Sequence, residues 1–255
     1  MSNPGPISPK RALITGGGTG IGRALALLLV ARGDRVLVCG RRAEPLEALK
    51  REQPAIEILS CDIAEASGRT HLVDAVHTRL GALDLLFNNA GLQLAQEYGS
   101  GKLRAEEVER EIAVNLTAPM LLCDRLLPLL LKSADPAIVN VISLLALIPV
   151  PRVPGYCATK AGLLNFSGAL RMQLASTPVR VIEFFPPFVD TPMTAGRGAN
   201  KMSAEECGKQ LLQGLATGHS RIAVGQAATL LFVHRFFPSL ATHMMWRISR
   251  PSRAR

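Results

Sequence analysis

The hydrophobic pattern of the chain alternates between short, nearly continuous apolar runs and longer segments with helical spacing. The segments between the runs, such as 21–33 and 68–81, carry apolar residues three and four positions apart and end in glycine. The pattern therefore predicts seven strands joined by helices. The apolar runs lie at 11–15, 35–40, 56–61, 83–88, 137–143, 179–185 and, more weakly, 221–225.

The strands are apolar on both faces rather than on one. A parallel sheet that is covered by helices on each side demands such strands, and strand–helix alternation at this spacing indicates βαβ units. We predict a single-domain α/β fold with a doubly wound, mainly parallel seven-stranded sheet and helices on both faces. This domain is expected at 10–225, between an N-terminal tail at 1–9 and a basic amphipathic C-terminal segment at 226–255.

Two irregular segments, 93–107 and 190–206, interrupt the alternation. The second is rich in Gly, Thr and Asn, and loops of this length in a compact domain are usually lids or other functional segments. We therefore expect it to border a binding site.

Composition excludes several classes of protein. The chain has 255 residues, of which 48% are hydrophobic and 19% charged, as expected of one well-packed domain. Charged residues or prolines interrupt the apolar stretches before they reach the ~20 residues of a membrane span, and the N-terminus has no secretion signal. The five cysteines lack metal-ligand spacing. We expect free thiols, no metal site and a cytoplasmic location.

The net charge of +9 is concentrated at 40–52 and 234–255. A basic surface attracts phosphorylated small molecules, nucleic acid or anionic lipid. Two Tyr and one Trp are too few for a base-stacking platform, so no nucleic-acid partner is expected. The C-terminal segment mixes Phe, Met and Trp with Arg and His, as interfacial helices do. We favour a helix packed on the domain or on a subunit partner, with peripheral membrane contact as the alternative.

The first predicted strand leads directly into a glycine-rich loop, TGGGTGIG at 15–22, and a helix follows. Glycine lets the backbone turn sharply and approach a diphosphate, whose charge is stabilised at the helix N-terminus. The position between strand and helix distinguishes a dinucleotide-binding loop from an ordinary tight turn. We expect the dinucleotide to contact Gly16, Gly18, Thr19, Gly20, Ile21 and Gly22.

The ends of the next strands complete this predicted cofactor site. The second strand ends at Gly40, where a carboxylate would hold the ribose of NAD, and Arg41 and Arg42 follow. Since a guanidinium binds phosphate in a bidentate manner, we predict NADP(H) rather than NAD(H), with Arg41 as the main ligand. The alternative is that both arginines are solvated. The third and fourth strands end in the other expected contacts, Asp62, Ile63, Asn89, Ala90 and Gly91.

The ordered motifs of the chain resemble those of the short-chain dehydrogenase/reductase family, from about Lys10 to about Val224. They are TGGGTGIG, CDI at 61–63, NNAG at 88–91, Asn115, Ser143, Tyr156-x-x-x-Lys160 and PPFVDT at 186–191. The combination of VCGRR, CDIAEASGR, YCATKAGL and PPFVDTPM is most similar to the branch labelled DltE-like oxidoreductases.

This resemblance implies a Rossmann-like fold and a homodimer or homotetramer that pairs the helices containing Asn115 and Tyr156. It also implies that Pro186 belongs to the cofactor site and that Val189 and Thr191 contact the carboxamide and the phosphates of the cofactor. Relatives commonly have glycine where Pro187 stands, so the path of this loop is expected to differ.

Tyr156 and Lys160 lie one helical turn apart and therefore on one face. The pKa of tyrosine, ~10, is too high for acid/base work at neutral pH, and a nearby ammonium group is expected to lower it. The resemblance implies that Tyr156 is the general acid/base and that Lys160 also holds the nicotinamide ribose. It further implies that Ser143 polarises the substrate oxygen and that Asn115 anchors a water of a proton relay.

We therefore predict an NADP(H)-dependent oxidoreductase that interconverts a carbonyl and a secondary alcohol. A non-catalytic NADP(H)-binding sensor or scaffold and a membrane-surface-associated reductase are the alternatives, and the complete set of four proton-relay residues favours an enzyme. For Arg152 we favour a solvated side chain over contact with an anionic group. The apolar lining suits a hydrophobic or medium-sized substrate, and we assign this pocket to Gln93, Ser143, Leu144, Leu145, Val150, Tyr156 and Pro187.

Overall fold

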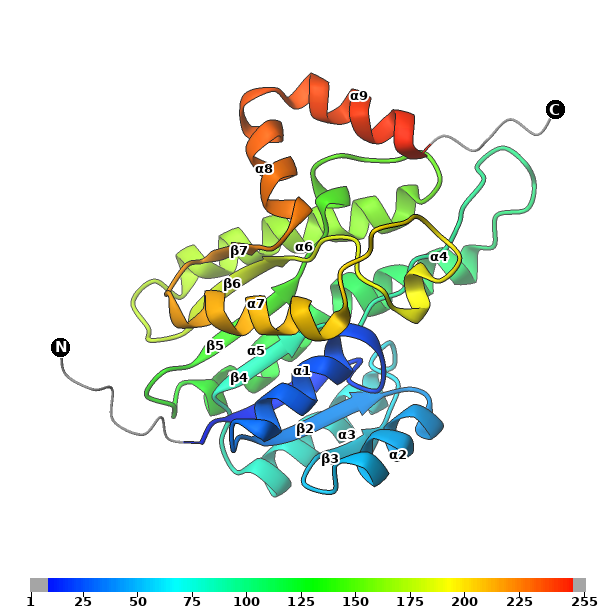
Figure 1. Ribbon diagram of the computed structural model, residues 1–255. Coiled ribbons are helices and arrows are strands. Elements are labelled where there is room, and N and C mark those ends of the chain that lie inside the picture. The colour runs from blue at the N-terminus through cyan, green and yellow to red at the C-terminus, as the bar shows by residue number, and fades with distance from the viewer. Residues whose placement is uncertain (1–8, 250–255) are drawn as a thin grey trace.

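The computed structural model describes residues 9–249, and strands alternate with helices as the hydrophobic pattern predicts (Figure 1). Residues 1–8 of the predicted N-terminal tail and 250–255 of the C-terminal segment lie outside this range. The strands are β1 (Arg11–Thr15), β2 (Arg35–Gly40), β3 (Glu57–Ser60), β4 (Leu85–Asn88), β5 (Ala137–Val141), β6 (Arg180–Phe185) and β7 (Arg221–Ala223). The helices are α1 (Gly20–Ala31), α2 (Ala43–Glu52), α3 (Ala66–Ala75), α4 (Ala105–Ile112), α5 (Ala118–Leu130), α6 (Pro154–Gln173), α7 (Ala204–Ala216), α8 (Gln226–Phe236) and α9 (Pro238–Ser249). Shorter helical turns are η1 (Val76–Leu80), η2 (Ala113–Thr117), η3 (Leu144–Ala146) and η4 (Pro192–Thr194).

The seven strands form one sheet in the order β3-β2-β1-β4-β5-β6-β7, and every pairing is parallel. The predicted doubly wound sheet is confirmed, including the weak seventh strand. After β3 the chain returns to the other side of β1, so the carboxyl ends of β1 and β4 flank the point where the winding reverses. Ligands of such sheets bind at this edge.

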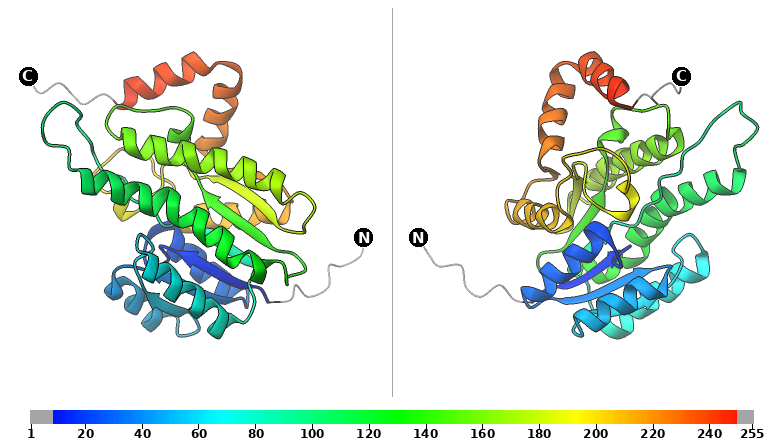
Figure 2. Two further views of the ribbon diagram at one scale, coloured as in Figure 1. Left: turned by 180° about the vertical axis from the view of Figure 1, so that it is seen from behind. Right: turned by 45° about the vertical axis from the view of Figure 1, so that its right-hand side comes forward.

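Alternate residues of each strand face the two helical layers. Ile14 and its neighbours on the same face pack with α1, α2 and α7, whereas Leu13 packs in the opposite layer with α3, α5 and α6. Seen from behind, α5 and α6 run across one face of the sheet, with α1 and α7 on the other (Figure 2). This double cover explains why the strands are apolar throughout.

The helical stretch from Ala105 to Leu130 is, by length and composition, the one segment among the described residues that could cross a membrane. In this fold it is a core helix, because Leu122, Leu126 and Leu129 are buried against the sheet. Pro128 was expected to interrupt the apolar stretch, yet α5 continues through it to Leu130. The length and the mean hydropathy of this helical stretch therefore reflect its packing in the core.

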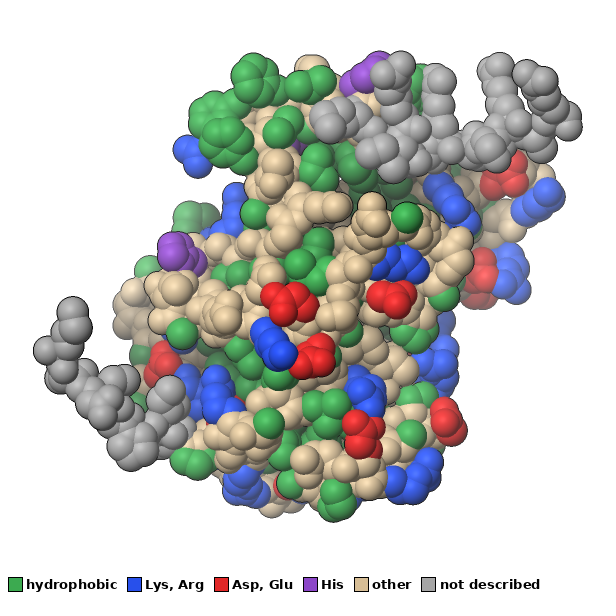
Figure 3. All heavy atoms as spheres, in the orientation of Figure 1, with side chains coloured by type: hydrophobic (Ala, Val, Ile, Leu, Met, Phe, Trp, Pro, Cys, Tyr) green, Lys and Arg blue, Asp and Glu red, His purple; other side chains and the backbone are tan. Residues whose placement is uncertain are grey.

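The chain after β7 forms α8 and α9, which project from one end of the molecule (Figure 1). Ala227 and Ala241 are buried, and Leu231 and Met245 are partly buried against the body. Apolar side chains gather on the outer surface of these two helices (Figure 3). The described part of the C-terminal segment, 226–249, therefore forms two helices, and only one side of them packs on the body.

Candidate active site at the carboxyl edge of the sheet

A cavity of about 1450 Å³ opens at the carboxyl edge of the sheet. It extends from the glycine-rich loop after β1 to the start of α6 and is bordered by the irregular segment after β6. Of the predicted site residues only Gly22 and Asn115 do not line it. Those that do are Gly16, Gly18, Thr19, Gly20, Ile21, Arg41, Arg42, Asp62, Ile63, Asn89, Ala90, Gly91, Gln93, Ser143, Leu144, Leu145, Val150, Tyr156, Lys160, Pro186, Pro187, Val189 and Thr191.

Two glycines of the loop serve different purposes. Gly16 has a φ of +67°, and a Cβ there would lie 2.8 Å from Ala90 Cα. At Gly22 a Cβ would lie 2.5 Å from both Asn89 Nδ2 and the Gly16 carbonyl oxygen. Gly22, which the sequence assigned to the cofactor, thus allows close packing of α1 beneath the loop.

Hydrogen bonds fix this loop to the end of β4. The Thr15 hydroxyl accepts from the N–H groups of Asn89 and Ala90, each at 3.0 Å. The Asn89 carboxamide donates to the carbonyls of Thr15 at 2.9 Å and Gly16 at 3.2 Å. No side chain caps the N-terminus of α1, and its first turn has no acidic residue. The N–H groups of this turn are therefore suited to bind a diphosphate.

The basic residues after β2 stand at the far end of the same cavity. Arg41 and Arg42 are exposed, and neither guanidinium forms an ion pair within the described part of the chain. Asp62 is already engaged, since it accepts hydrogen bonds from the Ala64 N–H at 3.0 Å and from Arg110. Burial raises the pKa of Asp62, but these bonds and the charge of Arg41 outweigh it and hold the pKa below its ordinary value. An adenine amino group would have to share this carboxylate with Arg110.

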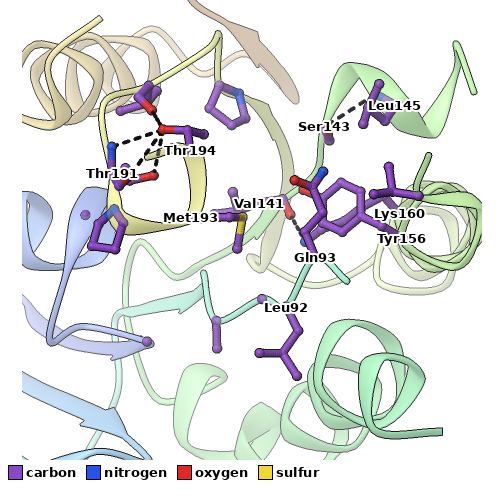
Figure 4. Close-up of a pocket in the computed structure, with 18 of the residues that line it drawn as sticks. Leu92, Gln93, Val141, Ser143, Leu145, Tyr156, Lys160, Thr191, Met193 and Thr194 are labelled. Carbon is purple, nitrogen blue, oxygen red and sulfur yellow. Dashed lines mark hydrogen bonds between the residues drawn. The ribbon is translucent and has the colours of Figure 1, made fainter. Parts of the chain in front are cut away.

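Ser143, Tyr156 and Lys160 meet at the other end of the cavity (Figure 4). Ser143 follows β5 and begins η3, where its hydroxyl accepts from the Leu145 N–H at 3.2 Å. Tyr156 is in the first turn of α6, and Lys160 is one turn later. Lys160 Nζ lies 5.7 Å from the centre of the Tyr156 ring and donates to the Val141 carbonyl at 2.8 Å.

The pKa of Tyr156 differs from the sequence expectation. Burial raises it to about 12, and the Ser143 hydroxyl and the charge of Arg197 only partly oppose this effect. Lys160 is itself buried, and this burial lowers its pKa to about 8 against the opposing influence of Glu111. In the cofactor-free protein, desolvation therefore outweighs the expected lowering of the phenol pKa.

Two buried polar residues that the sequence analysis missed hold this corner together. Glu111 on α4 accepts from the Leu94 N–H and from Gln96 Nε2, both at 3.0 Å. Gln96 in turn accepts from the Gly155 N–H at 2.9 Å, directly before Tyr156. Burial raises the pKa of Glu111, while these hydrogen bonds and Lys160 oppose the rise. The chain of contacts fixes the start of α6 relative to α4.

Asn115 lies behind the cavity in η2, a π-helical turn between α4 and α5. It is fully buried. Its Oδ1 accepts from the Leu92 N–H and its Nδ2 donates to the Leu92 carbonyl, both at 2.8 Å, and Nδ2 also donates to the Thr159 hydroxyl at 3.1 Å. The carboxamide of Asn115 thus holds the segment after β4 beside Lys160. That Asn115 also anchors a water stays a prediction.

Arg197 reaches the cavity from the irregular segment after β6 and was also missed. It donates to Gln93 Oε1 at 2.6 Å and to the Met193 carbonyl. Burial and the nearby charge of Arg152 lower its pKa. Arg152 is exposed at the cavity edge. The end of the cavity beside Tyr156 therefore carries more positive charge than the apolar segments that border it suggested.

Each of the five cysteines has a free thiol. Within residues 9–249, no group of three His, Cys, Asp or Glu side chains is placed to hold a metal ion.

The buried ammonium of Lys160 makes stability depend on pH. Its pKa is lowered from the ordinary 10.5 to about 8, so between these values the unfolded chain binds more protons and this residue favours folding increasingly as pH rises. At pH 7 the buried charge opposes folding. Lys160→Met should therefore stabilise the protein most, relative to wild type, at pH 7. The midpoint of thermal unfolding of the variant minus that of the wild type should fall by roughly 4 °C or more between pH 7 and pH 9.5.

Thermal unfolding of the cofactor-free protein at several pH values checks this prediction. The variant also loses the hydrogen bond from Lys160 to Val141, but that loss does not depend on pH. The test is therefore how the midpoint difference between variant and wild type changes with pH. Exposed Lys132→Met is the control and should show no such trend. A wild-type-to-variant difference that is constant from pH 7 to 9.5 would contradict the prediction.

Comparisons with known proteins agree with this fold. The chain is 39% identical to an uncharacterised oxidoreductase, DltE of Bacillus subtilis, over 82% of this chain and 86% of that protein. A short-chain dehydrogenase of Burkholderia cenocepacia in complex with NADP superposes with a TM-score of 0.82 at 26% identity, covering 95% of this chain and 98% of that one. A short-chain dehydrogenase of Sphingobium yanoikuyae in complex with NADPH superposes with a TM-score of 0.76 at 26% identity, covering 96% of this chain and 98% of that one.

The fold and these relatives thus define an oxidoreductase with a Rossmann-like sheet. Residues 10–202 match the family model for short chain dehydrogenases. The chain belongs to the short-chain dehydrogenase/reductase family. The predicted resemblance to its DltE-like branch is confirmed by the Bacillus relative.

Proposed function

We propose that the protein is an NADP(H)-dependent oxidoreductase that interconverts a carbonyl and a secondary alcohol on an apolar or medium-sized substrate. The observation that carries this proposal is the convergence of Ser143, Tyr156 and Lys160 on the cavity that also contains the glycine-rich loop and Arg41. A protein that only sensed the cofactor would have no use for a buried phenol beside an ammonium group.

The residues at the glycine end fit a dinucleotide. Gly16 and Gly20 have positive φ, and a Cβ at Gly18 would lie 3.2 Å from Pro45, so side chains here would reduce the space beside the uncapped start of α1. Arg41 and Arg42 offer exposed guanidinium groups that form no ion pair with a described residue, which suits a 2′-phosphate. The two NADP(H) complexes of similar structures support this preference.

At the other end, the chain's own residues handle the proton. When bound, the nicotinamide cofactor supplies or accepts the hydride. Tyr156 donates its phenolic proton to the carbonyl oxygen in reduction and takes it back in oxidation, while the Ser143 hydroxyl holds that oxygen. Lys160 keeps positive charge next to the phenol, and this charge is needed because burial alone disfavours the phenolate.

The substrate wall is mostly apolar. Leu145, Val150 and Met245 line the cavity, and Leu145 and Met245 pack in the cluster that contains Val150 and Tyr156. Such a wall favours an apolar body around the reacting carbon. Arg152 and Arg197 stand at its edge, where a polar part of the substrate would be accommodated.

We also propose a cytoplasmic homodimer or homotetramer. Ile112, Met120 and Leu121 on the outer side of the α4–α5 stretch are 36% to 41% exposed, and Met172 on α6 is 76% exposed. Exposed apolar residues on two adjacent helices are suited to pair with their copies in a symmetric interface.

Oxidation of NADPH and NADH, followed by absorbance with a panel of aldehydes and ketones of increasing apolar size, tests the proposed function. Turnover is expected with apolar carbonyls, with at least ~10-fold higher kcat/KM for NADPH, because one or two charge-assisted hydrogen bonds distinguish the two cofactors. Tight NADPH binding without turnover of any compound, in either direction, would favour the sensor.

A further inference from the structure

The outer surface of α8 and α9 is apolar and unusually exposed. Phe232, Phe236, Phe237 and Leu240 are 65%, 58%, 61% and 51% exposed. The rings of Phe232 and Phe236 lie 5.0 Å apart, so they form one continuous surface. Figure 3 shows these helices as a concentration of apolar side chains at one end of the molecule. We call this set of four residues the aromatic face.

The aromatic face is not the side on which the helices pack. Ala227 and Ala241 are fully buried, and Leu231 and Met245 contact clusters of the body. The small and aliphatic residues thus attach the two helices, while the large aromatic ones point outward. Large apolar patches of this kind usually mark an interaction surface.

The segment that carries the aromatic face has charges of one sign only. No Asp or Glu occurs after Glu206, whereas the segment 226–255 contains five arginines and two histidines. Arg235 lies over the ring of Phe236, with its guanidinium carbon 5.8 Å from the ring centre, and forms no ion pair with a described residue. Arg235 therefore adds positive charge directly beside the apolar surface.

A hollow of about 480 Å³ adjoins the aromatic face. Arg221, Arg235, Leu231 and Phe232 are among the residues that line it. Arg221 forms an ion pair with Glu183. The positive charge of Arg235 is therefore the one in this lining that no described carboxylate neutralises. Cationic groups next to apolar side chains suit an anionic head group whose acyl chains contact the aromatic surface.

We propose that the aromatic face docks the protein on a membrane surface that contains anionic lipids. Phe and Trp side chains with arginines are the composition of helices that lie in the interface between water and lipid. A second copy of this chain fits less well, because a two-fold interface through this face would bring two acid-free, positively charged segments together. The aromatic face would lie in the interface between water and lipid, and the protein would not cross the bilayer.

Docking would also place the substrate end of the cavity close to the lipid. Met245 of α9 lines the cavity, and the next residue, Trp246, is 41% exposed. The same short helix therefore borders both the cavity and the proposed membrane surface. This proposal does not depend on the identity of the reaction.

Co-sedimentation of the full-length protein with vesicles tests the proposal. Vesicles of phosphatidylcholine alone are compared with vesicles that also contain phosphatidylglycerol, at low and high salt. We expect binding to the anionic vesicles that weakens with salt. The triple variant Phe232→Ser, Phe236→Ser, Leu240→Ser should partition at least ~10-fold less, because the apolar area that it would bury is lost.

The matched control is Tyr98→Ser with Leu131→Ser, two residues that are 60% and 44% exposed elsewhere on the surface. This control should bind vesicles like the wild type, and both variants should keep the midpoint of unfolding and NADPH affinity. Wild-type protein that remains in solution with anionic vesicles would overturn the proposal. So would a triple variant that leaves vesicle binding unchanged, or that instead lowers the oligomeric mass in light scattering while the wild type binds no vesicles.

Discussion

Replacing Tyr156 by phenylalanine is expected to lower kcat by a factor of about 10³ or more, since a positioned general acid/base typically contributes ~10²–10⁴. The affinity for NADPH should change little. The ring is buried among Val150, Val153 and Cys157, and these contacts remain in the variant. Only the phenolic hydroxyl is lost, with its hydrogen bond to Ser143 and the proton that it would donate. Single-turnover absorbance measures the chemical step, and NADPH fluorescence measures binding.

The chain offers a matched control for this experiment, because it contains only two tyrosines. Tyr98 is 60% exposed in the irregular segment before α4. Tyr98→Phe should keep wild-type kcat. If Tyr156→Phe turned over a carbonyl at the wild-type rate, another group would have to supply the proton, and the proposed chemistry would be wrong.

Replacing Arg41 by aspartate is expected to invert the cofactor preference. The ratio of kcat/KM for NADPH to that for NADH should fall by about 100-fold or more, because charge-assisted hydrogen bonds to phosphate are lost and a repelling charge is introduced. The new carboxylate at the end of β2 would instead accept hydrogen bonds from the ribose of NADH. Arg41 is exposed, so the fold should tolerate the change.

Arg51→Asp controls for the overall loss of positive charge, because Arg51 is exposed in the last turn of α2 and does not line the cavity. Its effect on the ratio should be small and should disappear at high salt. Equal kcat/KM ratios for Arg41→Asp and wild type would show that another group selects the cofactor.

The sequence could predict the residues whose positions follow from regular periodicity. Tyr156 and Lys160 share a helical face because they are four residues apart, and the structure places both in the cavity. The strand ends meet at one edge because parallel strands point the same way, which brings Gly16 and Asp62 to one cavity. Periodicity determines which way a helical side chain points and at which edge a strand ends, and these predictions depended on nothing more.

The site residues that the sequence did not predict are of two kinds. Some lie in irregular segments without hydrophobic periodicity, and others are polar residues whose burial the sequence pattern does not show. Arg197 and Gln96 stand in irregular segments, so their inward direction depends on loop paths that the sequence pattern does not encode. Glu111 looks like an ordinary surface acid of a polar helix, yet it is buried and bonded to Gln96. The raised pKa of Tyr156 was missed for a related reason, since spacing shows a neighbouring charge but not the loss of water.

The wide turn η2 has an evolutionary consequence. A π-helical turn is equivalent to one extra residue in an α-helix, and it separates Glu111 on one side from the core residues of α5 on the other. Deleting a single residue within the turn would restore a regular α-helix and leave both parts in register, so α4 and α5 could stay packed while Asn115 lost its place against Leu92. Deleting a residue of α4 or α5 would instead rotate Glu111 relative to the core residues of α5 by about 100°. At this corner the length of the chain can therefore change only within the wide turn.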